Sequence, residues 1–421
     1  MSGRIRVGVL GCGAVGQAIA QRLAGSPHVS SLILADRDPR GATAALERVQ
    51  ERRVEQVAVE AVDARDPAQV AALARRADVV VNGTVPALNL VIMEGCLAGG
   101  ASYIDMAYGD KDYGHPMFAD QLRLDARFRA AGKLALCSFG IDPGASNLFA
   151  KRTADRMERV DWVKVRDADT GTVEGYELAT WFSPESMLEE VLHPPLAWED
   201  GRWVTTPPME VNEVYPFPPP VGPQRVWRTD HEESELIPQF LGKPVGQVDF
   251  MITLDETFIS HVKVLRKLGL TSFEPLDVKG TKVAPIDVVV AAMPRPDALA
   301  GKIRGHACVL VEVGGRLAGE DVVVRTWTTM SHEEAHALCG IHATAYQTGM
   351  PVVVAVEMMA RGEVGATGVR SPEALDPVRF VGYLPGHHIA VQEEVLPADP
   401  SGSLKSRTRR LSPPEESAGQ G

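Results

Sequence analysis

A glycine-rich turn between two apolar runs constrains this chain more than any other feature. Residues 5–38 contain an apolar run, the turn, an amphipathic stretch, a second apolar run and an acidic end. The turn carries Gly11, Gly13 and Gly16 in the spacing G-x-G-x-x-G, and Asp36 closes the second apolar run. This order predicts a βαβ unit that binds a dinucleotide.

Each glycine of the turn has its own expected role. Gly11 permits the tight turn, Gly13 lets a pyrophosphate approach the backbone, and Gly16 lets helix and strand pack closely. Ala14 and Val15 begin the helix, whose free N–H groups and positive dipole end suit phosphate oxygens. The alternative interpretation is an ordinary glycine turn of a doubly wound domain.

Composition narrows the class of protein. The net charge of −12 disfavours a nucleic-acid-binding or membrane-surface protein. Five scattered cysteines form no C-x-x-C pair, so we expect reduced thiols rather than disulfides or zinc ligands. No apolar run reaches the length of a membrane helix, and no signal segment precedes the first strand, which predicts a cytoplasmic protein. No metal site is expected, because no matching carboxylates accompany His332, His336 and His342.

The alternation of apolar runs and helical patterns divides the chain. Residues 1–150 predict an α/β lobe, a Rossmann-type doubly wound parallel sheet. Residues 151–330 show alternating strands, which predict a second α+β lobe with a mixed sheet. Within this lobe, the pair Gly314–Gly315 is expected near a hairpin turn, and the proline-rich stretch 205–223 is expected to be an extended loop.

The last part of the chain is expected to return to helix and then to lose order. Residues 331–390 contain a helical region that begins with a capping box at Ser331. Gly349 and Pro351 predict a kink or two packed helices in this region. Residues 397–421 are polar and rich in proline and serine, which predicts a disordered tail.

Several segments resemble the saccharopine dehydrogenase family, and in particular its saccharopine reductases, lysine 6-dehydrogenases and carboxynorspermidine dehydrogenases. The segments are VGVLGCGAVGQAIA, DVVVNGTVP, YIDMA, FGIDPGASNLFA, EGYELATWFSPESMLEE, WEDGRW, DHEESELIP, LRKLGLTSFEPLDVKG, ATAYQTGMPVVVAVEMMARGEVGATGV and SPEALDP. They span residues 5–385. The DPG turn, the SPES segment and the TAYQTGMP helix, in this order, are far more specific than the glycine turn.

The resemblance implies a two-lobed enzyme whose C-terminal helix returns to the first lobe. Such relatives are NAD(P)-dependent dehydrogenases that transfer hydride at the C–N bond of an amino acid, here saccharopine or lysine. A small-molecule amino-acid or amine substrate lies between the lobes, and a homodimer is implied. The alternatives are a carboxynorspermidine-type polyamine dehydrogenase, whose second lobe needs several acids, and a non-catalytic dinucleotide-binding relative.

Four residues are candidates for contacts with the ribose, the adenine and the nicotinamide of the cofactor. Asp36 can accept hydrogen bonds from ribose hydroxyls and repels a 2′-phosphate, which favours NAD, whereas Arg37 leaves NADP possible. Saccharopine reductases usually lack this acid and use NADP, so Asp36 moves the chain towards the lysine 6-dehydrogenase pattern. Asp63 resembles the family's adenine-side contact, or it caps a helix. Pro86 follows the fourth strand, where nicotinamide binds in such folds, or it is a plain loop residue.

Two residues are the candidates for catalysis. Asp105 ends the fifth strand, where a carboxylate could hold a substrate ammonium or relay a proton; the alternative is a turn cap. The resemblance puts His231 near the cleft, and histidine suits proton transfer near neutral pH. Glu232 beside it could bind a distal ammonium. Both residues could equally belong to the solvated first turn of a helix.

Further candidates for substrate binding lie at two predicted helix starts. Pro143, Gly144 and Asn147 surround a turn whose N–H groups could bind a carboxylate or the nicotinamide amide. Structural capping alone would also explain Asn147. By resemblance, Ser183 lines the substrate cleft.

Overall fold

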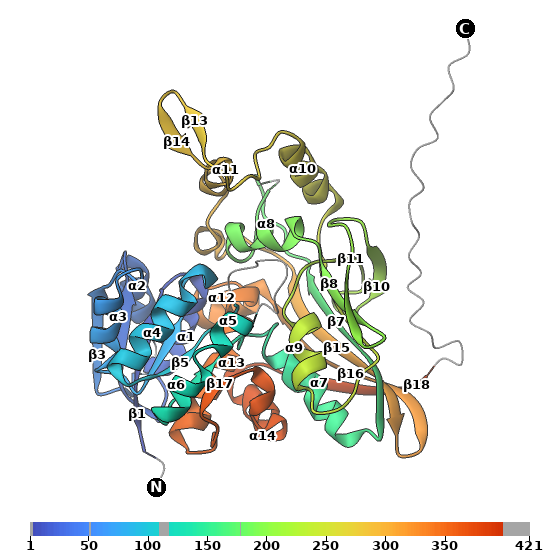
Figure 1. The fold of residues 1–421 in the computed structure, drawn as a ribbon, viewed down its shortest axis with the longest axis horizontal. Coiled ribbons are helices and arrows are strands. Elements are labelled where there is room, and N and C mark those ends of the chain that lie inside the picture. The colour runs from blue at the N-terminus through green and yellow to red at the C-terminus, as the bar shows by residue number, and fades with distance from the viewer. Residues whose placement is uncertain (1–2, 50–51, 109–117, 177, 399–421) are drawn as a thin grey trace.

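Two large sheets organise the chain into two lobes (Figure 1). The structure is a computed structural model that describes residues 3–49, 52–108, 118–176 and 178–398. The first lobe holds the blue and cyan elements of Figure 1, and the second lobe holds most of the green and yellow ones. Within the described residues, no helix is both long and apolar enough to cross a membrane.

The first sheet is parallel throughout. Its strands lie in the order β17 (Gly368–Arg370), β6 (Leu134–Leu136), β5 (Ser102–Ile104), β4 (Val79–Asn82), β1 (Ile5–Leu10), β2 (Val29–Asp36) and β3 (Gln56–Ala61). The order reverses between β1 and β4, which places the glycine turn after β1 at the switch point where doubly wound folds bind ligands. The Rossmann-type sheet is therefore confirmed.

Helices cover both faces of this sheet, which is why its strands are continuous apolar runs. They are α1 (Ala14–Ala24), α2 (Arg40–Glu47), α3 (Pro67–Ala74), the 3₁₀ turn η1 (Pro86–Leu88), α4 (Asn89–Gly99), α5 (Ala119–Leu122) and α6 (Asp125–Ala130). One buried cluster joins α1 to the sheet, and a second joins α3 and α4 to its opposite face.

The second lobe contains a mixed sheet, as expected. Its main path is β10 (Asn212–Pro216), β11 (Pro223–Arg228), β12 (Gln247–Thr253), β7 (Arg159–Asp169), β15 (His306–Leu317), β16 (Glu320–Ser331) and β18 (Val391–Pro397), with β8 (Leu196–Glu199) and β9 (Arg202–Thr205) beside β12. Only β12 and β7 pair in parallel on this path. The lobe also holds α7 (Ala145–Arg156), α8 (Pro184–Leu192), α9 (Glu233–Phe240), α10 (Glu256–Lys267), β13 (Leu276–Val278), β14 (Thr281–Val283), α11 (Pro285–Ala292) and η2 (Pro296–Leu299).

The chain then returns to the first lobe through α12 (His332–Cys339) and α13 (Ala343–Ala360). Helix α13 packs along α1, and β17 joins the edge of the first sheet beside β6. This confirms the returning C-terminal helix. After η3 (Pro372–Ala374), α14 (Pro377–Tyr383) and η4 (Leu384–His387), β18 crosses back to the second sheet, which the sequence did not predict.

The predicted hairpin and the two predicted helices are present, but their turns do not lie at the glycines that predicted them. The hairpin turn lies at Ala318–Gly319, whereas Gly314 and Gly315 lie inside β15, where any Cβ would fall 2.1 Å from atoms of β7. The helical region breaks at Gly340, which has a positive φ, and α13 continues through Gly349 and Pro351. A Cβ on Gly349 would lie 3.0 Å from the Ile19 side chain, so this glycine permits close packing of α13 on α1.

Two further segment predictions need adjustment. The stretch 205–223 is not loop throughout, because it contains the edge strand β10, a position that tolerates proline. Pro397 ends β18 rather than starting a tail, and residues 399–421 lie outside the described residues. Ser331 does cap α12, since its hydroxyl accepts the N–H of Glu334.

Candidate active site

A cavity of about 880 Å³ is lined by side chains from both lobes. It extends from the glycine turn after β1 to an acid-rich wall of the second lobe around His231. A second cavity, of about 580 Å³, lies at the ends of α1 and α13 and contains none of the predicted site residues. The first cavity is therefore the candidate active site.

The glycine turn has the shape that a pyrophosphate requires. Gly11 has φ +95°, and a Cβ there would lie 2.6 Å from the Gly83 backbone. A Cβ on Gly16 would lie 2.1 Å from the Gly11 carbonyl oxygen, so Gly16 is needed for packing and does not line the cavity. At Gly13, nothing within the described residues comes within 4 Å of an added Cβ.

The start of α1 is also available to a phosphate. The N-cap residue Gly13 makes no side-chain cap, and Ala14 and Val15 at the helix start line the cavity, where free N–H groups suit a phosphate. The open side of the turn and the uncapped helix fit a dinucleotide. This end of the cavity is where the cofactor would lie.

The acid at the end of β2 lines the same cavity and is held in place by backbone amides. Asp36 Oδ2 accepts the N–H of Cys12 at 2.6 Å, and Oδ1 accepts the N–H of Asp38 at 2.9 Å. Arg37 lines the cavity beside it, and Arg295 reaches the same cavity from the second lobe. The acid and two guanidinium groups thus line the same cavity as the glycine turn.

Asp63 and Pro86 also line the cavity. Asp63 is paired with Arg65 at 2.7 Å, and the hydrogen bond from that guanidinium lowers the pKa of Asp63 to about 2. The helix-cap alternative for Asp63 fails, because Asp66 caps α3 instead. Pro86 opens η1 directly after β4, at the carboxyl end of the sheet.

Asp105 is a buried carboxyl group at the end of β5. Its Oδ1 accepts the N–H of Ser138 at 2.5 Å, and its Oδ2 accepts Nε2 of Gln121 at 2.6 Å. Burial is the largest effect on this group and raises its pKa to about 7, although these hydrogen bonds lower it. Asp105 lines the cavity, so it can exchange a proton near neutral pH.

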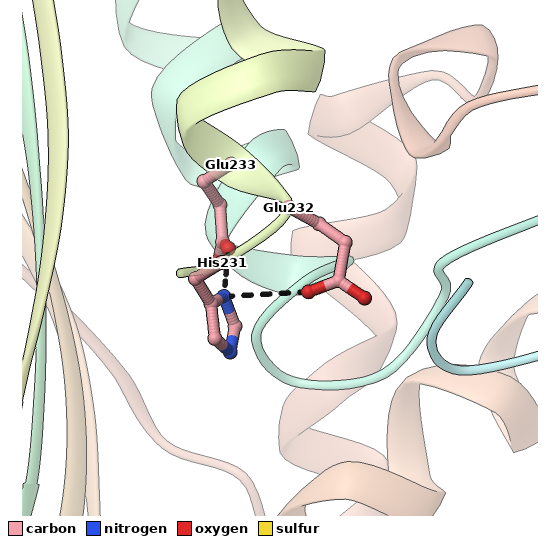
Figure 2. Close-up of side chains that lie close together, drawn as sticks. All are labelled: His231, Glu232 and Glu233. Carbon is pink, nitrogen blue, oxygen red and sulfur yellow. Dashed lines mark hydrogen bonds and ion pairs between the residues drawn. The ribbon is translucent and has the colours of Figure 1, made fainter. Parts of the chain in front are cut away.

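His231 lies between two neighbouring carboxylates (Figure 2). Its Nδ1 is hydrogen-bonded to Glu233 and lies 3.7 Å from Oε2 of Glu232, while its ring stacks on Phe250 at 3.7 Å between centroids. Burial alone would lower the pKa of His231, but the charge and hydrogen bond of Glu233 raise it well above the ordinary value. His231 and Glu232 line the cavity, whereas Glu233 stands behind them and accepts the hydroxyl of Ser146 at 2.7 Å.

The three adjacent residues of Figure 2 are close enough to share a metal ion. A protonated His231 already places a positive charge between the two carboxylates, which accounts for the arrangement without a metal. Of the three histidines that the sequence singled out near α12, His332 and His342 are buried and make structural contacts, whereas His336 is exposed. Nε2 of His332 pairs with Asp169 at 3.0 Å, and the His342 side chain caps α13.

Sequence reasoning missed several acids of the same wall. Asp142, Asp167 and Glu190 line the cavity beside His231. Burial first, and then the charge of Asp167, raise the pKa of Asp142 well above its usual range, and burial raises the pKa of Asp167 to about 8. Oδ2 of Asp142 is buried without a hydrogen-bond partner among the described residues. Asp142 belongs to the DPG turn that the sequence singled out. The alternation of side chains along β7 could have indicated that Asp167 lies on a buried face.

The structure separates the other candidate substrate residues. Pro143 and Ser183 line the cavity, and Ser183 also caps α8. Gly144 and Asn147 do not line it. Asn147 is fully buried, accepts the N–H of Gly144 at 2.9 Å and donates to Glu373 at 2.8 Å, so the capping alternative describes its contacts.

Fold and cavity together define a two-lobed dehydrogenase in which a dinucleotide turn faces an acidic second lobe. Residues 7–136 match the saccharopine dehydrogenase NADP binding domain, and residues 140–389 match the saccharopine dehydrogenase C-terminal domain. The chain therefore belongs to the saccharopine dehydrogenase family, and it is an NAD(P)-dependent enzyme.

Curated relatives and solved structures agree with this assignment. The chain is 26% identical over 381 residues to carboxyaminopropylagmatine dehydrogenase of Synechocystis, covering 90% of this chain and 95% of the relative. It is 30% identical over 330 residues to carboxynorspermidine synthase of Vibrio cholerae, covering 77% and 78%. Saccharopine dehydrogenase (L-Glu forming) of Saccharomyces cerevisiae shares the fold with TM-score 0.68 at 16% identity, covering 93% and 100%. Homospermidine synthase of Legionella pneumophila, solved with NAD, does so with TM-score 0.70 at 16% identity, covering 97% and 94%.

Proposed function

We propose that this enzyme transfers hydride at the C–N bond of a carboxylated amine that carries further positive charge. The observation that carries the proposal is the set of five carboxyl groups at one end of the cavity: Asp105, Asp142, Asp167, Glu190 and Glu232. A substrate with several ammonium groups would satisfy these acids. It would also supply a partner for the orphaned oxygen of Asp142.

The names of the curated relatives support the same substrate class. Carboxyaminopropylagmatine and carboxynorspermidine are carboxylated amines with several basic groups. The sequence first favoured saccharopine or lysine, with a polyamine substrate as the alternative. The acidic wall now favours that alternative, and saccharopine and lysine remain the natural competitors in an assay. Trp181 and Phe182 line the cavity as well, and their rings suit contact with alkyl-ammonium chains.

The residues of the acidic wall would have different roles in the reaction. A nicotinamide dinucleotide held at the glycine turn by Gly11 and Gly13 would supply the hydride chemistry, as acceptor from the amine carbon or as donor to the imine carbon in reverse. In the reductive direction, His231 holds a proton that it can give to the imine nitrogen. Asp105 can serve a second proton transfer near neutral pH. The remaining carboxyl groups would hold the distal ammonium groups and so orient the reacting carbon.

For the cofactor we propose a preference for NAD. The carboxylate of Asp36 would repel a 2′-phosphate and accept the ribose hydroxyls instead. Arg37 and Arg295 favour NADP instead, because a guanidinium can hold a 2′-phosphate. The NAD preference therefore depends on Asp36 outweighing the two arginines.

The direct test is a spectrophotometric assay of reduced nicotinamide. Purified enzyme receives NAD⁺ or NADP⁺ together with lysine, saccharopine, carboxynorspermidine or carboxyaminopropylagmatine. We expect kcat/KM for a carboxylated polyamine to exceed that for saccharopine and lysine by at least about tenfold. This is the factor expected when one charge-assisted hydrogen bond to the substrate is gained. A higher value with saccharopine would overturn the substrate assignment. Tight cofactor binding without turnover of any amine would overturn the activity itself.

We further propose that the enzyme works as a homodimer in the cytoplasm. All five cysteines are buried and unpaired, which supports a reducing compartment. The dimer is what the resemblance to the saccharopine dehydrogenase family implies.

A further inference from the structure

A basic set of side chains lines the second cavity, which has a volume of about 580 Å³. It lies in the first lobe, where residues from the carboxyl ends of α1, α2, α12 and α13 meet residues of η4. Four arginines and two histidines face it, against one carboxylate: Arg22, Arg48, Arg53, Arg361, His28, His387 and Glu357. The net charge of the chain is −12, so this excess of positive charge is local.

Two of these arginines have no counter-charge. Among the described residues, neither Arg22 nor Arg48 has a carboxylate at ion-pair distance, and Arg22 donates to the Gly386 carbonyl oxygen at 3.2 Å. The Arg48 guanidinium packs on Gly340, where an added Cβ would lie 3.0 Å from three of its atoms. Burial raises the pKa of Cys339 to about 11, and the charges of Arg48 and Arg22 oppose that rise. Both guanidinium groups therefore lie close to the same cavity wall.

The one carboxylate is already bound by the protein. Oε1 of Glu357 accepts the Ser26 hydroxyl at 2.7 Å, and Oε2 lies 3.3 Å from Nη2 of Arg361 and 3.4 Å from Nε2 of His387. Burial would raise the pKa of Glu357, but the hydrogen bonds of His387 and Ser26 lower it to about 2, so this group is ionised at neutral pH. A further nitrogen of each partner, Nη1 of Arg361 and Nδ1 of His387, is buried without a hydrogen-bond partner among the described residues.

Helix capping alone does not account for this arrangement. Arginines are favourable at the carboxyl ends of helices, and such a role describes the contact of Arg22 with Gly386. It leaves unexplained the buried, unpartnered nitrogens of Arg361 and His387 beside an open volume. An anion in the cavity would give these groups a partner.

We propose that this cavity binds a small organic phosphate, whose phosphate group is held by Arg22, Arg48 and Arg361. Because Glu357 offsets one of these guanidinium groups, about two positive charges remain for the ligand. A phosphate monoester carries about −1.5 to −2 at neutral pH, which a monocarboxylate does not match, and its oxygens suit bidentate guanidinium contacts. Arg53, which also lines the cavity, is not needed for this balance.

The size and the apolar part of the lining fit an organic ester better than inorganic phosphate. Val49 and Leu338 line the cavity and would contact the organic part, and the volume is in the range of small-molecule sites. The proposal does not depend on the substrate or the cofactor, because this cavity shares no lining residue with the candidate active site.

The test is isothermal titration calorimetry of the full-length enzyme. The enzyme is kept saturated with NAD⁺ or NADP⁺, whichever binds more tightly, so that the glycine turn is occupied. Phenyl phosphate is the probe, phenol is its uncharged counterpart, and citrate is a polycarboxylate. We expect one phenyl phosphate per chain and no binding of phenol. Arg22→Gln and Arg48→Gln should each raise the Kd at least about tenfold, the factor for one lost charge-assisted hydrogen bond.

The matched control is Arg75→Gln. Arg75 is the exposed C-cap residue of α3, as Arg48 is of α2, but it lines neither cavity. This variant should keep the wild-type Kd, and thermal melts check that each variant is folded. Because Arg48 is exposed, Arg48→Gln should fold even if Arg22→Gln does not. Absence of phenyl phosphate binding at millimolar concentration, an unchanged Kd in Arg48→Gln, an equal loss in Arg75→Gln, or tighter binding of citrate overturns the proposal.

Discussion

The contact between Glu233 and His231 makes a sharp prediction about the pH dependence of catalysis. Glu233 is fully buried, hydrogen-bonds Nδ1 of His231 and raises its pKa. In Glu233→Gln the negative charge disappears, while the side-chain oxygen that accepts the Ser146 hydroxyl can remain. The change therefore alters the proton affinity of His231 with little change in volume.

The magnitude follows from the kind of hydrogen bond that is lost. A hydrogen bond to a charged group contributes about 1.5–3 kcal/mol, and about 1.4 kcal/mol corresponds to one pKa unit, so the pKa of His231 should fall by about one to two units. In the mechanism that we propose, His231 donates its proton in the reductive direction, so the rate should be lost as pH rises through its pKa. The alkaline fall of the rate should thus move to lower pH by the same one to two units.

The assay is the pH profile of kcat in the reductive direction with saturating imine-forming substrates. The matched control is Glu357→Gln. Glu357 also faces a buried histidine, His387, at 3.4 Å, but it lies outside the active-site cavity. The control should keep the wild-type profile while its melting temperature falls. If the folded Glu233→Gln enzyme loses activity at the same alkaline pH as the wild type, His231 is not the proton donor.

Three further predictions concern the cofactor, the glycine turn and a buried ion pair. Asp36→Ser should raise the NADP-to-NAD ratio of kcat/KM at least about tenfold by removing like-charge repulsion, and an unchanged ratio would refute the role given to this acid. Gly16→Ala should cost about 1–3 kcal/mol in unfolding free energy, since the new Cβ would overlap the backbone of the turn, whereas Gly386→Ala, in open space, should cost little in a denaturant titration. Arg166→Met should cost about 3–5 kcal/mol, because the guanidinium is 1% exposed and its removal takes the nearest positive charge from Glu213 and leaves Asp249 with only the longer contact to Arg228. Arg40→Ala, at an exposed pair, should leave the unfolding free energy nearly unchanged, and equal losses for the two arginines would contradict the burial argument.

The sequence determined the first lobe and the class of enzyme because their signals are local. Gly11, Gly13, Gly16 and Asp36 act through backbone conformation and short-range packing, which spacing along the chain records. The alternation of apolar runs likewise fixed a parallel sheet, because strands covered on both faces must be continuously apolar. The order of the specific motifs along the chain then indicated the saccharopine dehydrogenase family.

Turn and helix positions were less predictable where tertiary packing competes with local preference. A glycine in a sequence reads as a turn, but Gly314 and Gly315 were needed for close approach to β7 and Gly349 for approach to α1. Strand β18 was missed because its partner, β16, supplies the hydrogen bonds from a distant part of the chain.

Only the tertiary structure assembled the acidic wall. Asp105, Asp142, Asp167 and His231 come from separate segments, and nothing in their spacing shows that the fold brings them to one cavity. Their proton affinities are also tertiary properties, because burial raises the pKa of the three aspartates and the neighbouring Glu233 raises the pKa of His231. The sequence by itself thus determined a dinucleotide-binding dehydrogenase, whereas the substrate that we propose depends on the buried charges that only the tertiary structure brings together.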